Sequence, residues 1–174
     1  MPAVPFLKNS LPVDELLVRE LTIDDVAFVA LAFLPDRTES ELYGHTLDEL
    51  PILRESGFLT PFVIVDGGGE GRILGGLTLT RYDPARARVE LGYWLFPEAR
   101  GRGIATRVVR AVADEAFANG IARLEAVARP ENSASIRVLE RAGFRREGTL
   151  RSLLPHGDGR ADAQIYSLLP DDRP

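Results

Sequence analysis

Cysteine is absent from the 174-residue sequence, and histidine is scarce. Without cysteine there can be no disulfide, no thiolate metal site and no covalent acyl-cysteine intermediate. The two histidines, His45 and His156, lie far apart, and neither stands in the spacing of a metal-ligand pair. The sequence therefore predicts that no metal is bound.

Long apolar runs and an excess of positive charge are missing as well. No apolar run approaches the ~20 residues that a membrane-spanning helix needs. The segment Met1–Ser10 lacks the basic stretch and apolar core of a signal peptide, so we expect a cytoplasmic location and no membrane partner. With 21 Lys and Arg against 26 Asp and Glu, the net charge is −5. This balance argues against a nucleic acid partner, because its phosphates require a basic face.

The chain is long enough for one domain with a hydrophobic core but short for two. We expect a single domain over residues 1–174, with its core at about 16–169. Apolar patterning predicts seven strands: Leu16–Arg19, Phe62–Val65, Arg72–Thr80, Arg88–Phe96, Arg123–Ala128, Phe144–Leu150 and Asp162–Leu169. Helices are predicted over 22–28, in the interrupted stretch 34–57, from Gly103 to Asn119–Gly120, and over Ser133–Ala142. Strands in a run that later alternate with helices favour a mixed α/β sheet covered by helices.

One tight loop stands out between a predicted strand and a predicted helix. It consists of Arg100, Gly101, Arg102, Gly103, Ile104 and Ala105. Glycines allow a phosphate to approach the backbone, and the helix start offers N–H groups without internal partners. The dinucleotide pattern would need a third glycine, and the phosphate-loop pattern a Gly-Lys-Ser/Thr ending. The loop therefore suits a different diphosphate; on its residues alone, an ordinary turn is the alternative.

The loop is part of a longer pattern that resembles a known family. Arg100–Ala105 matches the Gln/Arg-x-x-Gly-x-Gly/Ala signature of the GCN5-related N-acetyltransferase (GNAT) superfamily. The flanks resemble its RimJ/RimL-like branch, in which a strand like Glu90–Leu95 and then a proline precede the loop. A segment like Asn132–Ser135, followed by a helix ending as Ala142–Phe144 does, comes after it. The resemblance covers about Leu16 to Leu169, and its combined motifs are specific.

The resemblance implies a fold and a reaction. The fold would be a twisted, mostly antiparallel sheet of about seven strands, with helices on both faces and a splay between the fourth and fifth strands. The reaction would be direct acetyl transfer from acetyl-CoA to a primary amine, which agrees with the absence of cysteine. The loop amides would hold the CoA pyrophosphate, and the pantetheine would pair with the strand that ends at Leu95–Phe96. The residues implied for CoA binding are Leu95, Phe96, Arg100, Gly101, Arg102, Gly103, Ile104, Ala105 and Asn132.

Glu90 is the candidate general base. Attack on a thioester needs a neutral amine, so a proton must be removed directly or through water. Alternation places Glu90 on the face of its strand with Trp94 and Phe96, where partial desolvation would raise the pKa of the carboxylate. The alternative is a structural glutamate paired with Arg88 or Arg81.

Ser135 is the candidate for assisting the leaving thiolate. Many superfamily members carry a tyrosine seven residues after the asparagine that corresponds to Asn132, but here that position is Leu139. The RimJ/RimL-like branch carries a serine where Ser135 stands, and its hydroxyl can donate to sulfur or fix a water. The alternatives are a plain first-turn position for Ser135 and a helix N-cap for Asn132.

Three weaker candidates for substrate binding are Tyr43, His45 and Tyr166. The first two lie in the stretch that corresponds to the family's substrate-covering helices, whereas Tyr166 lies on the last strand, where an aromatic residue usually belongs to the core. The resemblance favours a protein N-terminus, such as that of a ribosomal protein, as the acceptor. A small-molecule amine (an aminoglycoside, polyamine or amino acid) or a non-catalytic acyl-CoA-binding module are the alternatives. The family often forms homodimers.

Overall fold

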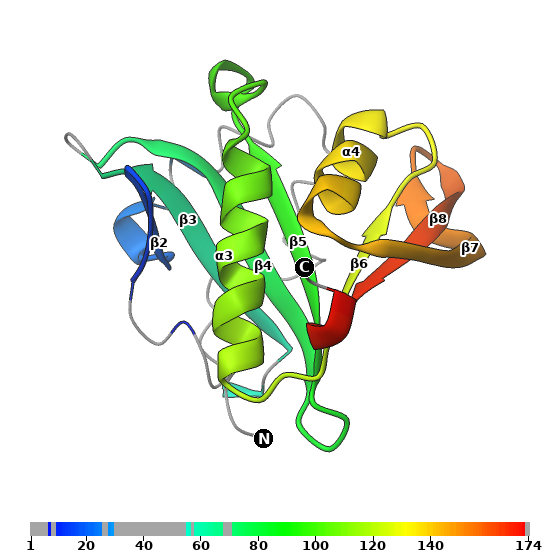
Figure 1. Ribbon diagram of the computed structural model, residues 1–174. Helices are drawn as coiled ribbons and strands as arrows, with labels where there is room; N and C mark the ends of the chain where they lie inside the picture. Colours follow the sequence, from blue (N-terminus) through cyan, green and yellow to red (C-terminus); the bar gives the residue numbers. More distant parts are fainter. Residues whose placement is uncertain are drawn as a thin grey trace.

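The computed structural model describes residues 7, 10–25, 28–29, 55–56, 58–67 and 71–172. In this part of the chain, eight strands form one sheet in the order β1-β2-β3-β4-β5-β6-β8-β7 (Figure 1). The strands are β1 (Leu11–Val13), β2 (Leu16–Glu20), β3 (Leu59–Asp66), β4 (Ile73–Asp83), β5 (Arg88–Leu95), β6 (Arg123–Ala128), β7 (Arg145–His156) and β8 (Gly159–Leu168). The predicted mixed α/β sheet is thereby confirmed, with β1 as an additional short edge strand.

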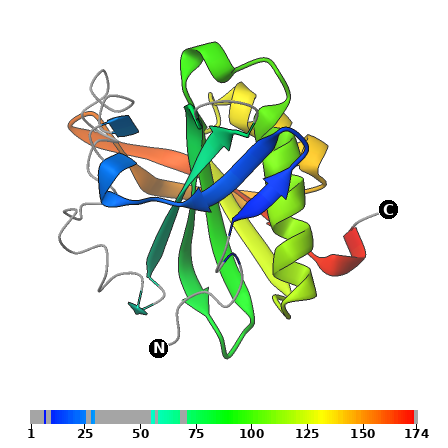
Figure 2. The same cartoon turned by 90° about the vertical axis from the view of Figure 1, so that its left-hand side faces the viewer.

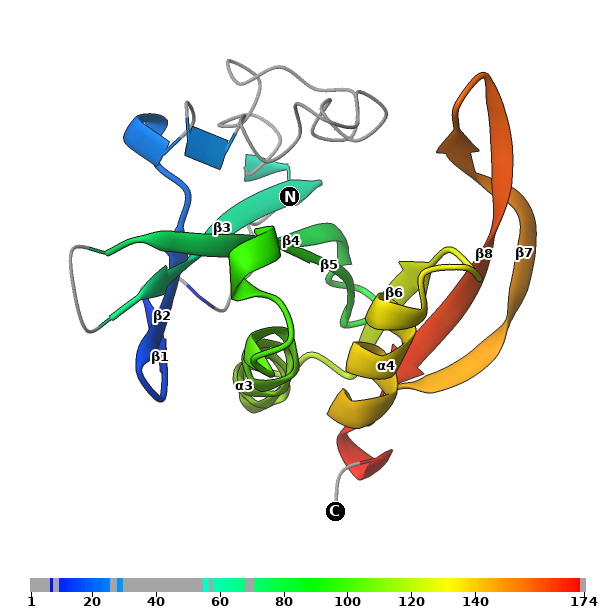
Figure 3. The ribbon, with the colours of Figure 1, turned by 90° about the horizontal axis from the view of Figure 1, so that it is seen from above.

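Two α-helices, α3 (Ile104–Ala118) and α4 (Ser133–Ala142), lie side by side on one face of the sheet (Figure 3). Three short 3-10 turns complete the described elements: η1 (Ile23–Asp25), η3 (Pro97–Ala99) and η4 (Pro170–Asp172). The turn η1 lies on the face opposite α3 (Figure 2). None of the helices in these residues is long and apolar enough to cross a membrane.

The predicted splay lies between β5 and β6, the fourth and fifth of the predicted strands. These two strands form the sheet's parallel pair, and they pair only from Arg88–Arg123 to Glu90–Glu125. Beyond that point β5 continues to Leu95 and β6 to Ala128. The strands therefore part after the third of the eight residues of β5, while the neighbouring β4–β5 ladder continues from Glu90 to Leu95.

The alternation predicted for β5 is confirmed by the two apolar clusters. Val89 and Leu91 belong to the main core between the sheet and the two helices, with Tyr93 and Leu95 packed against it. Trp94 and Phe96 instead pack against a smaller cluster on the opposite face, which contains Val29, Val63, Val65 and Ile73. Glu90 shares the face of Trp94, because side chains of a strand alternate.

Two predictions of local structure need correction. The last hairpin is longer than predicted: β7 continues to His156 and β8 begins at Gly159, so the turn is much tighter than the gap between the predicted strands Phe144–Leu150 and Asp162–Leu169. In the predicted helix 22–28, residues 23–25 form a 3-10 turn, in which the Asp25 carboxylate accepts hydrogen bonds from the Thr22 N–H and hydroxyl, whereas residues 28 and 29 are α-helical. The helices predicted within 34–57 fall almost entirely outside the described residues.

Candidate active site

The loop between β5 and α3 has the geometry that an anion-binding turn requires. Gly101 and Gly103 both have φ +73°, in the left-handed region that favours glycine. A Cβ atom built on either one meets no atom within 4 Å, so the loop faces open space at both glycines. Ile104 and Ala105 are buried and anchor the start of α3 in the core.

The start of α3 leaves backbone donors for a ligand. Gly103 occupies the N-cap position and has no side chain to accept from the first turn. The helical hydrogen bonds begin with Arg107, whose N–H donates to the Gly103 carbonyl at 3.1 Å. Helix N-termini of this kind bind phosphates through free N–H groups and a partial positive charge.

Three arginines of the loop and the first turn of α3 differ in their contacts. Arg100 donates from Nε to the Leu95 carbonyl at 3.0 Å and so fixes the loop against the end of β5. Arg107 is held by Asp14 at 2.8 Å and by Glu15 at 2.8 Å. This pairing, with a smaller contribution from Arg102, lowers the pKa of Glu15 to about 2. Arg102 is exposed on the loop, where its charge can reach an anion at the helix start.

Glu90 lies at the point where β5 and β6 part. Its side chain is only 12% exposed, and Arg81, which is 63% exposed, donates to its carboxylate at 2.9 Å. Burial raises the pKa of Glu90, and the nearby Glu125 charge adds to the rise, whereas Arg81 and Arg88 oppose it. The pKa of Glu90 is thus raised despite the ion pair with Arg81. The geometry agrees with both interpretations of Glu90, as a general base and as a partner of an arginine.

The immediate surroundings of Glu90 are more polar than the strand pattern suggested. Thr80 lies opposite it on β4, and Glu125 lies opposite it on β6. Trp94 lies two alternate positions further along β5, roughly 13 Å away at ~3.3 Å per residue. Desolvation of Glu90 therefore arises at the junction of the three strands, while the aromatic rings form a separate cluster.

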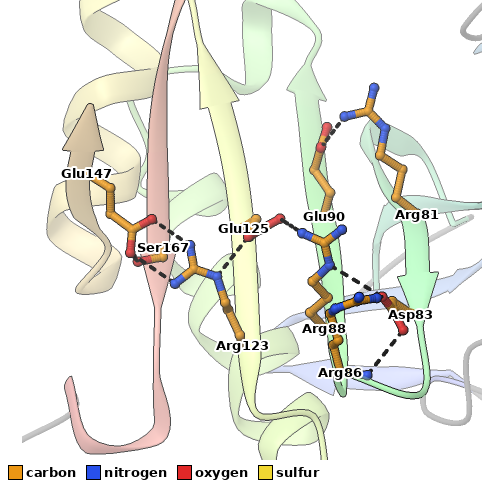
Figure 4. Close-up of polar contacts among 9 residues, drawn as sticks. All are labelled: Arg81, Asp83, Arg86, Arg88, Glu90, Arg123, Glu125, Glu147 and Ser167. Atoms are coloured by element: carbon orange, nitrogen blue, oxygen red, sulfur yellow. Dashed lines mark hydrogen bonds and ion pairs between the residues drawn. The ribbon is translucent and has the colours of Figure 1, made fainter. Parts of the chain in front are cut away.

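A ladder of ion pairs crosses the sheet beside Glu90 (Figure 4). Glu125 is held by Arg123 at 2.7 Å and by Arg88 at 3.4 Å. Arg123 also binds Glu147 of β7, which accepts a hydrogen bond from Ser167 at 2.6 Å. The ladder joins β5, β6, β7 and β8 and keeps an acidic group next to Glu90.

Ser135 and Asn132 lie at the start of α4. The Asn132 side chain accepts a hydrogen bond from the Ser135 N–H at 3.0 Å, which confirms that Asn132 is the N-cap of the helix. A role of Asn132 in CoA binding stays a prediction. Ser135 is half-buried, and its hydroxyl lies 2.9 Å from the Tyr93 hydroxyl.

Tyr93 is the residue that sequence reasoning missed at this site. Alternation placed it on the core side of β5, and its ring does pack against the main core. Its hydroxyl, however, reaches the first turn of α4 and also donates to the Ser135 carbonyl at 3.0 Å. The two residues are 42 positions apart in the chain, and no local pattern indicates such a contact.

The remaining candidates are further from this arrangement or outside it. Tyr166 is 1% exposed within the main core, and its hydroxyl donates to Gln164 at 3.0 Å; its role in substrate binding stays a prediction. Leu139 is fully buried in the core. Tyr43 and His45 lie outside the described residues. In the part of the chain that the structure describes, no group of three Asp, Glu or His side chains is arranged to hold a metal ion.

Comparison with known proteins identifies similar sequences and structures. Residues 15–145 match the family described as "Acetyltransferase (GNAT) domain". The "Probable N-acetyltransferase YjcK" of Bacillus subtilis is 42% identical over 84 residues, which are 47% of this chain and 46% of that protein. The chain spans about half the length of the Bacillus subtilis relatives that it matches.

Similarity to the RimJ/RimL-like branch extends over more of the chain. The ribosomal-protein-serine acetyltransferase of Escherichia coli is 27% identical over 123 residues, which are 70% of this chain and 67% of that protein. The structure of Mycobacterium smegmatis RimJ in complex with CoA-disulfide has a TM-score of 0.79 at 26% identity. That similarity covers 95% of this chain and 88% of RimJ.

Proposed function

Because the chain belongs to the GNAT acetyltransferase family, we propose that it transfers an acetyl group from acetyl-CoA directly to a primary amine. The observation that carries this proposal is the splay: β5 and β6 part beside a partly buried carboxylate, and β5 ends at a glycine loop that opens a helix. These features supply a place for a thioester, for a proton and for a diphosphate.

The loop and the splay would hold different parts of CoA. The pyrophosphate would lie against the N–H groups at the start of α3, with Gly101 and Gly103 leaving the approach open. The pantetheine would then follow the free edge of β5 back from Leu95 toward Glu90, as an added strand does. Tyr93 and Ser135 border this path from the helix side of the sheet.

Glu90 and Ser135 serve the two ends of the reaction. The amine nitrogen attacks the thioester carbon, the C–S bond breaks, and a thiolate leaves. Glu90, on the face opposite the helices, removes the proton from the amine, and its raised pKa suits that role. Ser135, on the helix side, donates a hydrogen bond to the departing sulfur. Opposite sides of the sheet thus handle proton removal and thiolate stabilisation.

The acceptor that we propose is a protein α-amino terminus. The support is the likeness to proteins described as acting on ribosomal proteins, including the one of Escherichia coli. The net charge of −5 suits a cationic acceptor of this kind.

A screen of acceptors tests the proposal. The purified protein is mixed with acetyl-CoA and with peptides that carry ribosomal-protein N-termini, with aminoglycosides, polyamines or free amino acids, and the released CoA thiol is measured. We expect thiol release with one or more peptides and an acetylated N-terminus by mass spectrometry. Turnover only with small amines would overturn the proposed acceptor. Acetyl-CoA binding without turnover on any amine would indicate a non-catalytic module.

A further inference from the structure

We propose that Tyr93 is a positioning residue, which orients the Ser135 hydroxyl toward the sulfur of the departing CoA. The inference rests on the proposed acetyl transfer and assigns a role to a side chain that the fold alone would leave in the core. It depends on the contact between β5 and the first turn of α4.

The location of Tyr93 is specific to the splay. The pairing of β5 with β6 ends at Glu90, and Tyr93 lies three residues further along β5. Its ring packs against the main core, yet its hydroxyl emerges at the N-terminal turn of α4 rather than in the apolar interior. A phenylalanine would fill the apolar part of this space, so what the tyrosine adds is the pair of polar contacts made by its hydroxyl.

The hydroxyl has two partners but one proton. It lies 3.0 Å from the Ser135 carbonyl and 2.9 Å from the Ser135 Oγ atom. A tyrosine can donate one hydrogen bond and accept others. When it donates to the carbonyl, Ser135 must donate to it, and the serine proton is occupied. When it donates to Oγ, the serine proton is released to point elsewhere.

This exchange fits the needs of the leaving group. Before reaction the Ser135 hydroxyl donates its hydrogen bond to the Tyr93 oxygen. As negative charge grows on the sulfur, Ser135 can turn its proton to the sulfur while Tyr93 turns its own to Oγ. Chains of hydrogen bonds polarise one another, so the tyrosine makes the serine a stronger donor. No proton has to leave either hydroxyl.

Burial keeps Tyr93 in the form that this role requires. It raises the pKa of the phenol to about 12, well above the usual pKa of a thiol, about 8.5. The phenol therefore stays protonated across the working pH range and acts as a donor, whereas full proton transfer to the thiolate would be uphill. The alternative is that the contact only anchors α4 to β5.

Kinetics of Tyr93→Phe, Ser135→Ala and the double variant separate these possibilities. We expect each single variant to lower kcat by about tenfold, the scale of one lost hydrogen bond, with KM and the affinity for acetyl-CoA nearly unchanged. The double variant should be no slower than the worse single variant, because both changes remove the same function. Tyr82→Phe, a change in another half-buried tyrosine packed against the core, is the control and should keep the wild-type kcat.

The pH profile and the thermal midpoint complete the test. The acidic limb of the kcat profile should keep its position in Tyr93→Phe, since Tyr93 does not titrate there. A normal kcat in Tyr93→Phe would overturn the inference, as would multiplicative losses in the double variant. If kcat falls only in proportion to a fall in the thermal midpoint, the contact merely anchors α4 to β5, and the inference is overturned. Wild-type protein that transfers acetyl to no amine would instead overturn the proposed function.

Discussion

At the scale of single residues, Glu90 combines a nearly buried carboxylate with an exposed ion-pair partner, Arg81. An ion pair that served stability alone would be expected to lower the pKa of the carboxylate, but burial together with the Glu125 charge raises it. A carboxylate kept in a costly environment is typical of a functional site.

Glu90→Gln should lower kcat by about 100-fold or more, the usual contribution of a general base. The acidic limb of the pH profile should disappear, while acetyl-CoA affinity measured by calorimetry stays the same. The control is Glu147→Gln, which removes an ion-paired carboxylate at the far end of the ladder and should keep a normal profile. An unaltered acidic limb in Glu90→Gln would remove Glu90 as the base.

The same substitution has an opposite expected effect on stability. Since the folded pKa of Glu90 is raised, its protonated form is favoured by folding, and its contribution to stability is lost as pH rises through that pKa. Glutamine does not titrate, so the variant does not lose this stability as the pH rises. The thermal midpoint of Glu90→Gln relative to wild type should therefore be higher at pH 7 than at pH 4, which thermal unfolding at both pH values would measure.

At the scale of elements, the start of α3 depends on backbone conformation. Gly103→Val places a β-branched residue at φ +73°, at a cost of about 1–2 kcal/mol, and puts a side chain where the pyrophosphate would lie. We expect the dissociation constant for acetyl-CoA, measured by calorimetry, to rise by tenfold or more. A Cβ atom at position 103 would meet no other atom of the protein within 4 Å, so the loss of affinity should come from a clash with the bound pyrophosphate.

Gly120→Val is the matched control for that prediction. Gly120 follows the other end of α3, has φ +85°, and also faces open space. The two variants should lose similar thermal stability, but Gly120→Val should bind acetyl-CoA normally. Equal affinity of both variants would show that the loop is only a turn.

The sequence predicted the elements whose patterns are strong. Strand β5 and helices α3 and α4 have regular apolar spacing and clear ends at Pro97, Asn119–Gly120 and Gly143. Strand β1 escaped prediction because it is three residues long and contains Pro12. The full length of β7 escaped because most of its residues are exposed and alternate little in polarity.

The candidate site was predictable to the extent that it is local. The glycine loop and Glu90 could be predicted because neighbouring residues determine a turn and a strand face. The contact of Tyr93 with Ser135, and the register that sets Glu90 beside Glu125, could not. Both join segments that are far apart in the chain and meet only when the strands have found their order.

At the scale of the whole molecule, the splay divides the sheet into β1–β5 and β6–β8. Three residue pairs connect the two parts directly, from Arg88–Arg123 to Glu90–Glu125. The main core under α3 and α4 spans both, since it includes Leu91 of β5 and Leu124 of β6. On the opposite face the ion-pair ladder crosses the junction and continues to Glu147. Charge therefore supports the join on the face opposite the two helices.

Ion pairs between arginine and a carboxylate lie on both sides of the splay, at Asp25 and at Glu147, and they predict a sensitivity to acid. Hydrogen bonds from arginine lower the pKa of Asp25 and of Glu147 to about 2, against about 4 for unfolded carboxylates. Groups with depressed folded pKa values stabilise the protein above the unfolded pKa, and this contribution is lost as pH falls toward 2. The thermal midpoint of the wild type should hold from pH 7 to about 5 and then decline.

Glu147→Gln tests whether the ladder takes part in that decline. The variant should lose at most about 3 °C at pH 7, because the Glu147 side chain is 41% exposed and solvent screens the pair. Arg123 keeps its partner Glu125 at 2.7 Å, so no charge is left without a counterion. Between pH 5 and pH 2 the variant should decline less steeply, and its midpoint should meet that of the wild type near pH 2. Parallel curves over this range, measured by circular dichroism, would show that the Glu147 pair does not contribute to the acid-dependent part of the stability.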